Sequence, residues 1–141
     1  MARVSFEPRY ALPIMRPPDL EALKEIILRP DVPGREFGEA MIHFGEDDER
    51  SVLSLLHHGP LGYYLHYFQH FTRPDRADWL SLGDPTRLAE VVMPDDWEAS
   101  AGLFIPTDRA WLVIEEFCRS GRRSDKIDWI RPEDMPEEGM W

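Results

Sequence analysis

Residues 105–130 constrain the fold more than any other part of the sequence, because they predict one helix, an abrupt stop and a short strand. Thr107 stands at the N-cap position, Asp108 adds negative charge to the first turn, and Pro106 precedes both. Apolar side chains then recur at the spacing of one helical face, at Ala110, Val113, Ile114, Phe117 and Cys118. We expect this face to lie on a β-sheet, with Trp111 at its rim.

Gly121 predicts the end of this helix, because glycine adopts the left-handed C′ conformation without strain. Basic side chains follow near the negative end of the helix dipole, at Arg119, Arg122 and Arg123. Residues 126–130 then alternate well enough for a strand of about five residues, a common length. We expect Trp129 in this strand to pack inside the protein.

The same block carries a recognisable order of features: a proline before the helix, Glu-Phe near the helix end, a Gly-Arg turn, and a strand with a tryptophan. The residues concerned are Pro106, Glu116, Phe117, Gly121, Arg122, Ile127 and Trp129. In this order they resemble the C-terminal signature of an immunity-protein family from bacterial polymorphic toxin systems. Members of that family are small α/β proteins that bind and neutralise a cognate toxin domain, often a nucleic-acid deaminase. The resemblance therefore implies a toxin-binding protein.

The rest of the chain predicts a first helix and several hairpin-connected strands. The helix spans residues 19–29, bounded by prolines, and the strand patterns fall at 4–6, 40–44, 51–57, 63–71, 79–82 and 88–93. Segment 51–57 is apolar throughout, which indicates a central strand covered on both sides. Two helices on a largely antiparallel sheet of about six strands define an α+β fold. We expect residues 1–131 to form a single domain, of the immunity type if the resemblance holds, and residues 132–141 to form an acidic tail, either disordered or an extra docking arm.

Length and cysteine content set independent limits. A chain of 141 residues that is 43% hydrophobic is long enough for one domain without disulfides or metals. The single cysteine, Cys118, lies on the apolar face of the predicted helix and excludes an intramolecular disulfide. The sequence contains neither an apolar run that would span a bilayer nor a secretion signal. We therefore expect a cytoplasmic protein that does not enter the membrane.

The charge balance limits the choice of partner. The chain has 27 acidic and 16 basic residues, a formal net charge of −11 and a pI near 4.8. Direct binding to nucleic acid is disfavoured, because phosphates repel such a chain unless it presents a basic patch. A toxin domain with a basic cleft would instead be attracted electrostatically. The alternative is that the negative charge serves solubility alone.

No pattern in the sequence predicts catalysis, a metal site or a cofactor site. His66 and His70 have the i, i+4 spacing of zinc ligands on a helix, but in a strand they would stand roughly 13 Å apart. The chain has no Gly-x-Ser-x-Gly elbow and no phosphate-binding glycine loop. One cysteine cannot supply the paired cysteine ligands of a zinc deaminase. We expect a protein that is not an enzyme.

The candidate partner-binding residues combine negative charge with aromatic side chains. They come from two acidic turns and from the aromatic strand. The first turn contains Glu46, Asp47, Asp48 and Glu49, the second contains Asp95, Asp96, Trp97 and Glu98, and the strand contributes Tyr64 and His66. Trp97 is a possible anchor of the kind enriched at interface hot spots, unless it folds back onto the core. Tyr64 and His66 are exposed only if neither helix covers their face of the strand.

These observations favour an immunity protein that binds a toxin and occludes its active cleft without turnover or cofactor, and the resemblance implies that the toxin is a nucleic-acid deaminase. The runner-up is an adaptor domain that binds a protein other than a toxin.

Overall fold

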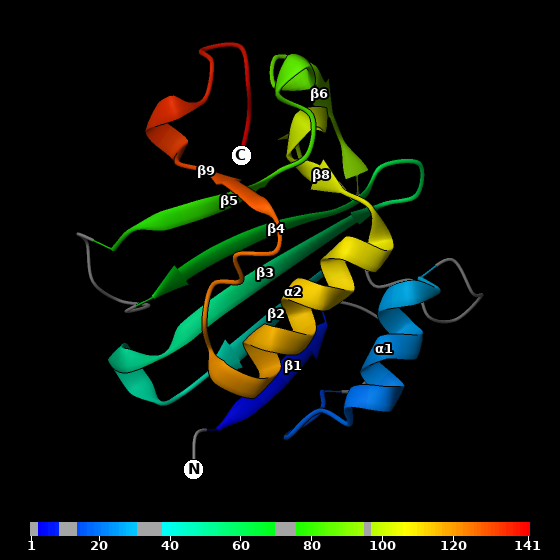
Figure 1. Ribbon diagram of the computed structural model, residues 1–141, viewed down its shortest axis with the longest axis vertical. Coiled ribbons are helices and arrows are strands. Elements are labelled where there is room, and N and C mark those ends of the chain that lie inside the picture. Colours follow the sequence, from blue (N-terminus) through cyan, green and yellow to red (C-terminus); the bar gives the residue numbers. More distant parts are fainter. Residues whose placement is uncertain (1–2, 9–13, 31–37, 70–75, 95–96) are drawn as a thin grey trace.

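The computed structural model describes residues 3–8, 14–30, 38–69, 76–94 and 97–141. Within these residues a seven-stranded sheet carries both helices on one of its faces, and every strand pair is antiparallel (Figure 1). The predicted α+β class is confirmed, including a C-terminal helix followed by a short terminal strand.

The strands of the main sheet lie in the order β1-β2-β3-β4-β5-β9, and β8 also pairs with β4. Their bounds are β1 Val4–Pro8, β2 Glu39–Phe44, β3 Ser51–His58, β4 Gly62–Gln69, β5 Asp78–Leu82, β8 Phe104–Ile105 and β9 Asp128–Ile130. A small second sheet pairs β6 (Val91–Val92) with β7 (Ala99–Ser100). The helices are α1 (Leu20–Leu28) and α2 (Thr107–Ser120). Single 3₁₀ turns occur at Asp47–Glu49, Pro85–Arg87, Ala101–Leu103 and Pro132–Asp134.

Local sequence explains where the helices begin and end. The Asp19 carboxylate accepts the backbone N–H groups of Glu21 and Ala22, which caps α1. Gly121 ends α2 with φ 70°, the left-handed conformation predicted for it. The predicted N-cap Thr107 is wrong by one residue, since Pro106 holds the cap position and no side chain caps this end. The extended backbone of Pro106 already places its carbonyl to accept the Ala110 N–H at 2.9 Å.

Strand alternation divides the sheet into a front face, under the helices, and a rear face. The front-face core joins the sheet to both helices through Phe6, Ile42, Leu53, Leu65 and the buried side of α2. The predicted apolar face of α2 is buried as expected. Trp111 does not lie at the rim of this face and is only 5% exposed. Because α1 packs beside α2, a wider part of the α2 surface is buried than the sequence predicted (Figure 1).

A second core cluster lies where residues 83–105 fold back against β3, β4 and β5. It contains Leu56, Tyr64, Leu80, Leu88, Ala99, Leu103 and Phe104. The strand predicted at 88–93 is reduced to the two residues of β6, since Pro85–Arg87 forms a 3₁₀ turn capped by the Asp84 carboxylate. Met135 of the C-terminal tail also packs against this cluster.

Tyr63 and Tyr64 make opposite use of their hydroxyl groups, and this difference predicts opposite effects of removing them. The Tyr63 hydroxyl donates to the carbonyl of Ile27 at 2.8 Å within the front core. The Tyr64 hydroxyl is buried, and among the described residues it has no hydrogen-bond partner. We expect Tyr63→Phe to lower the free energy of unfolding by about 1 to 2 kcal/mol, because a buried carbonyl loses its donor.

Tyr64→Phe is the matched control on the same strand, and we expect it to leave stability unchanged or to raise it by up to about 1 kcal/mol. Urea unfolding monitored by circular dichroism measures both variants. Equal losses in the two variants would mean that the Tyr64 hydroxyl is hydrogen-bonded in solution, contrary to this assignment.

Candidate functional site

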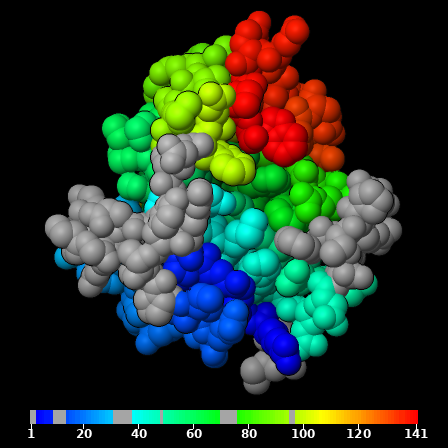
Figure 2. All heavy atoms as spheres, turned by 180° about the vertical axis from the view of Figure 1, so that it is seen from behind, coloured from blue at the N-terminus to red at the C-terminus, as the bar shows by residue number. Residues whose placement is uncertain are grey.

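The rear face carries polar, ionisable and apolar side chains that the register places in two rows across the strands. One row runs Glu7, Met41, Ser54 and His66 from β1 to β4; the other runs Ser5, His43, Val52 and Phe68. Six of these eight are partly exposed, and Val52 and Phe68 are buried. Figure 2 shows this side of the molecule, opposite to the helices. Partly exposed polar side chains of this kind are typical of the solvent-facing side of an antiparallel sheet.

His66 contacts three aromatic rings and one carboxylate on this face. Its ring lies parallel to that of Tyr64 at 6.4 Å, and it meets Phe68 and Trp141 edge to face at 5.3 and 5.7 Å. Its Nε2 atom lies 3.6 Å from an oxygen of Asp78. Burial lowers the pKa of His66, although the Asp78 carboxylate opposes this effect. The imidazole is therefore neutral at pH 7 and adds no positive charge to the rear face.

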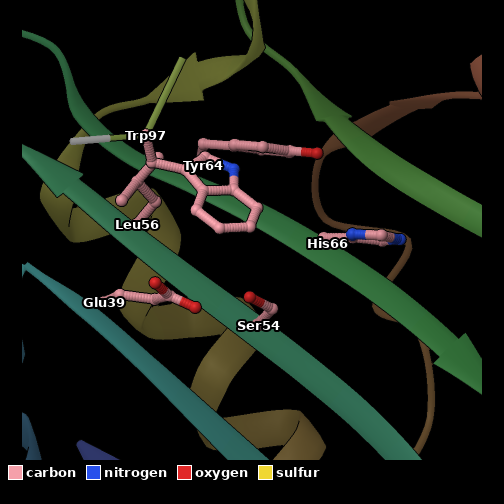
Figure 3. Close-up of a pocket in the computed structure, with 6 residues that line it drawn as sticks. All are labelled: Glu39, Ser54, Leu56, Tyr64, His66 and Trp97. Atoms are coloured by element: carbon pink, nitrogen blue, oxygen red, sulfur yellow. The ribbon is translucent and has the colours of Figure 1, made fainter. Parts of the chain in front are cut away.

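A small pocket lies beside His66. Its volume is about 40 Å³, and its lining consists of Glu39, Ser54, Leu56, Tyr64, His66 and Trp97. Figure 3 shows the Trp97 indole over this space, with the Glu39 carboxylate and the Ser54 hydroxyl directed toward it from β2 and β3. Trp97 is 49% exposed, so the indole forms a wall of the pocket and part of the outer surface at once.

Exposed apolar side chains gather beside this pocket. Two segments, the hairpin of β6 and β7 and the C-terminal tail, meet where Ser100 N–H donates to the Met140 carbonyl and Met140 N–H donates to Ser100 Oγ, both at 2.9 Å. Figure 2 shows the tail in red beside the yellow-green hairpin. We define the tryptophan surface as the exposed apolar side chains of these segments: Val91, Met93, Trp97, Met140 and Trp141.

A second depression, of about 730 Å³, lies along β1 and the turn after β2. Its charged lining is balanced, with Arg3, Arg16 and Arg50 against Glu7, Glu46 and Asp47. Ser5, Glu7 and His43 meet there, but the Ser5 hydroxyl donates to Glu7 at 2.8 Å, and His43 Nε2 lies 3.5 Å from the same carboxylate. A serine nucleophile must instead donate to the histidine, so this arrangement is not a catalytic triad.

The described residues of the two predicted acidic clusters lie at opposite ends of β2 and β3, so these residues do not come together. Glu46, Asp47 and Glu49 are exposed at the turn between these strands, where Glu46 pairs with Arg3 at 2.9 Å. The side chain of Asp48 lies outside the described residues. In the other cluster, Asp95 and Asp96 also lie outside them, whereas Trp97 and Glu98 are exposed.

Tyr64 and His66 do lie on the face that the helices leave open, but neither is fully exposed. Tyr64 is 5% exposed and His66 is only partly accessible, because residues 83–105 and the tail cover that end of the sheet. No local pattern in the sequence singles out Glu39 or Ser54, which reach His66 and Trp97 through strand pairing, while Trp141 reaches His66 through the path of the tail. Of these, only Trp141 had a signal, as an aromatic residue in a segment that is otherwise acidic.

The described part of the chain contains no group of three or more His, Cys, Asp or Glu side chains placed to hold a metal ion. Burial raises the pKa of Cys118 to about 12, so this side chain is a neutral thiol within the front core. In the described ranges, no helix combines the length and the apolar character needed to cross a membrane.

Comparisons of the chain with protein-family models, with curated proteins and with solved structures gave no match.

Proposed function

We propose that this protein is an immunity protein, which binds a toxin domain with a basic cleft and blocks that cleft. The observation that carries the proposal is the tryptophan surface together with the charge around it. Residues 84–100 and 132–141 contain nine acidic side chains and one basic one, so they hold −8 of the net charge of −11. Negative charge concentrated around exposed tryptophans fits a positively charged protein partner.

Three of the residues that resemble the immunity-protein signature, Phe117, Gly121 and Trp129, make specific contacts in the C-terminal part of the fold, which is compatible with the proposal. Phe117 packs edge to face on Phe44 and Tyr67 at 6.2 and 5.9 Å. The Tyr67 hydroxyl donates to the Gly121 carbonyl at 3.1 Å, and the Trp129 indole N–H donates to the Ser124 carbonyl at 2.7 Å.

Inhibition would follow from charge and shape. An enzyme that acts on nucleic acid needs a positive cleft, and a partner with opposite charge is drawn to it at rates well above those of neutral proteins at low salt. Once docked, the acidic protein would fill the space that the phosphate backbone needs. The complex would be stoichiometric, with no reaction on the immunity protein itself. A nucleic-acid deaminase is the toxin class that the resemblance favours.

Co-expression with the toxin domain encoded beside this gene tests the proposal. We expect the protein to restore growth, to copurify with the toxin in a one-to-one complex, and to suppress its activity in vitro. Loss of association on raising salt from 50 to 500 mM would support electrostatic steering. Growth arrest despite soluble expression of both proteins would refute the proposal, and an adaptor for another protein is then the better description.

A further inference from the structure

The tryptophan surface is unusual for the number of large apolar side chains that it exposes. Among the described residues, eight such side chains are exposed, and five of them are Val91, Met93, Trp97, Met140 and Trp141. Tryptophan is enriched at interface hot spots, and methionine adapts its shape to different partners. Apolar side chains gathered within an acidic surround mark a protein-binding surface rather than a surface that only faces water.

The charge around this surface restricts what can dock on it. The exposed acidic side chains of the two segments are Asp84, Glu90, Glu98, Glu133, Asp134, Glu137 and Glu138. Two of them are paired with arginines of this chain, Glu90 with Arg87 at 2.7 Å and Glu133 with Arg131 at 3.4 Å. With Asp95 and Asp96 included, the two segments contain nine acidic residues and Arg87, a formal charge of −8, or −7 when Arg131 is counted with Glu133. An acidic partner or a polyanion would therefore be repelled.

The pocket beside Trp97 adds a specific chemical preference. Its aromatic walls come from Trp97, Tyr64 and His66, and its polar groups include the Glu39 carboxylate and the Ser54 hydroxyl (Figure 3). Indole and phenol faces attract cations, and a carboxylate adds a charge-assisted hydrogen bond. Because burial lowers the pKa of His66, the imidazole is neutral and does not repel a cation.

The size of the pocket indicates a side chain rather than a free metabolite. Pockets for small molecules measure about 300 to 1,000 Å³, whereas this one measures about 40 Å³. That space holds a few heavy atoms, as many as the end of an arginine or lysine side chain provides. An inserted arginine would also lay its guanidinium plane against the indole, a favoured contact.

We propose that the tryptophan surface is the docking site for the toxin, and that one arginine or lysine from the rim of the toxin's basic cleft enters the pocket between Trp97 and Glu39. This inference rests on the proposed function for the identity of the partner. It assigns Trp97 and Trp141 as the anchors, and Glu39 as the residue that selects a cation. The acidic turn at Glu46–Glu49, at the far end of β2 and β3, contributes only long-range attraction.

A first experiment tests the surface without the toxin. The probe is a peptide of six arginines, and the control is a peptide of six glutamines, each titrated into ¹⁵N-labelled protein at low salt. The indole N–H signals of Trp97 and Trp141 are expected to shift saturably with the arginine peptide only. The buried Trp111 is the internal reference, and its signal should not move. Larger shifts at Asp47 and Glu49 than at Trp97 would overturn the proposal.

A second experiment measures binding of the toxin domain by titration calorimetry. Trp97→Ala is expected to weaken binding at least about 30-fold, the equivalent of a hot spot of about 2 kcal/mol. Glu39→Gln keeps the shape of the side chain and removes its charge, and we expect a loss of about tenfold or more. Leu112→Ala and Glu25→Gln, exposed on the helices, are matched controls that should bind as the wild type does.

The outcomes separate this inference from the proposed function. If the wild type neutralises the toxin and both Trp97→Ala and Glu39→Gln bind it with unchanged affinity, the docking site is wrong and the function stands. If the wild type does not bind the toxin, the function fails, and the arginine titration alone decides whether the pocket receives cations. A loss of binding in Glu39→Gln cannot be attributed to misfolding, because an isosteric change on a partly exposed strand residue should leave the melting temperature within a few degrees of the wild type.

Discussion

Replacing Gly62 with alanine is expected to lower the free energy of unfolding by about 4 kcal/mol, a loss that few single substitutions reach. Gly62 opens β4 immediately after the turn from β3, with φ +97°. A side chain at that φ is strained in any L-residue, at a cost of about 1 to 3 kcal/mol. A β-carbon there would also lie 2.1 Å from the carbonyl oxygen of Ile105. Since that oxygen belongs to β8, the clash cannot be relieved by rotating a side chain.

Gly59 in the same turn is the matched control. A β-carbon at Gly59 meets no atom within 4 Å, and its φ lies outside the left-handed region. Gly59→Ala should therefore leave stability unchanged or raise it by a few tenths of a kcal/mol, through the unfolded state. Urea unfolding of both variants is the measurement. If Gly62→Ala unfolds within about 1 kcal/mol of the wild type, β8 does not approach β4 as closely as described.

The sequence predicted correctly those structural features that depend on residues a few positions apart in the chain. The apolar face of α2 and the Gly121 stop depend on neighbours in the chain, and the structure confirms both. Strands β2, β3 and β5 were found within one residue by alternation and propensity. The errors include the exact first residue of α2, the position of Trp111, which is buried rather than at the rim, and the strand at 88–93, which the structure shortens to β6.

The candidate site was only partly predictable, because it is made by contacts between distant residues. Trp97 and His66 were singled out for their residue types, but their meeting around one pocket depends on how residues 83–105 fold over β4. The contact of Trp141 with His66 spans more than half of the chain. No periodicity encodes such contacts. The balance of charge was visible from composition, whereas its position around the exposed tryptophans required the structure.

The buried side chain of Ser81 allows one edge of β4 to pair with two different strands, β5 and β8. Strand β4 pairs with β5 from His66 to Phe68, and with β8 at Tyr63 and Tyr64. Leu65 lies between these two stretches, so its N–H has no ladder partner on that side. The Ser81 hydroxyl accepts this N–H at 2.9 Å and donates to the Leu103 carbonyl at 2.6 Å. It thus satisfies two buried backbone groups at the point where the partner changes.

Ser81→Ala is therefore expected to lower the free energy of unfolding by about 3 kcal/mol, since each buried backbone group left unsatisfied costs about 1 to 3 kcal/mol. Packing contributes little to this loss because alanine fits the same fully buried space. Ser54→Ala, on the partly exposed rear face, is the control and should change stability by less than about 0.5 kcal/mol. Hydrogen exchange adds a local readout: the Leu65 amide should exchange faster in Ser81→Ala than amides in the centre of β3. A Leu65 amide that stays fully protected in that variant would show that another acceptor replaces the serine.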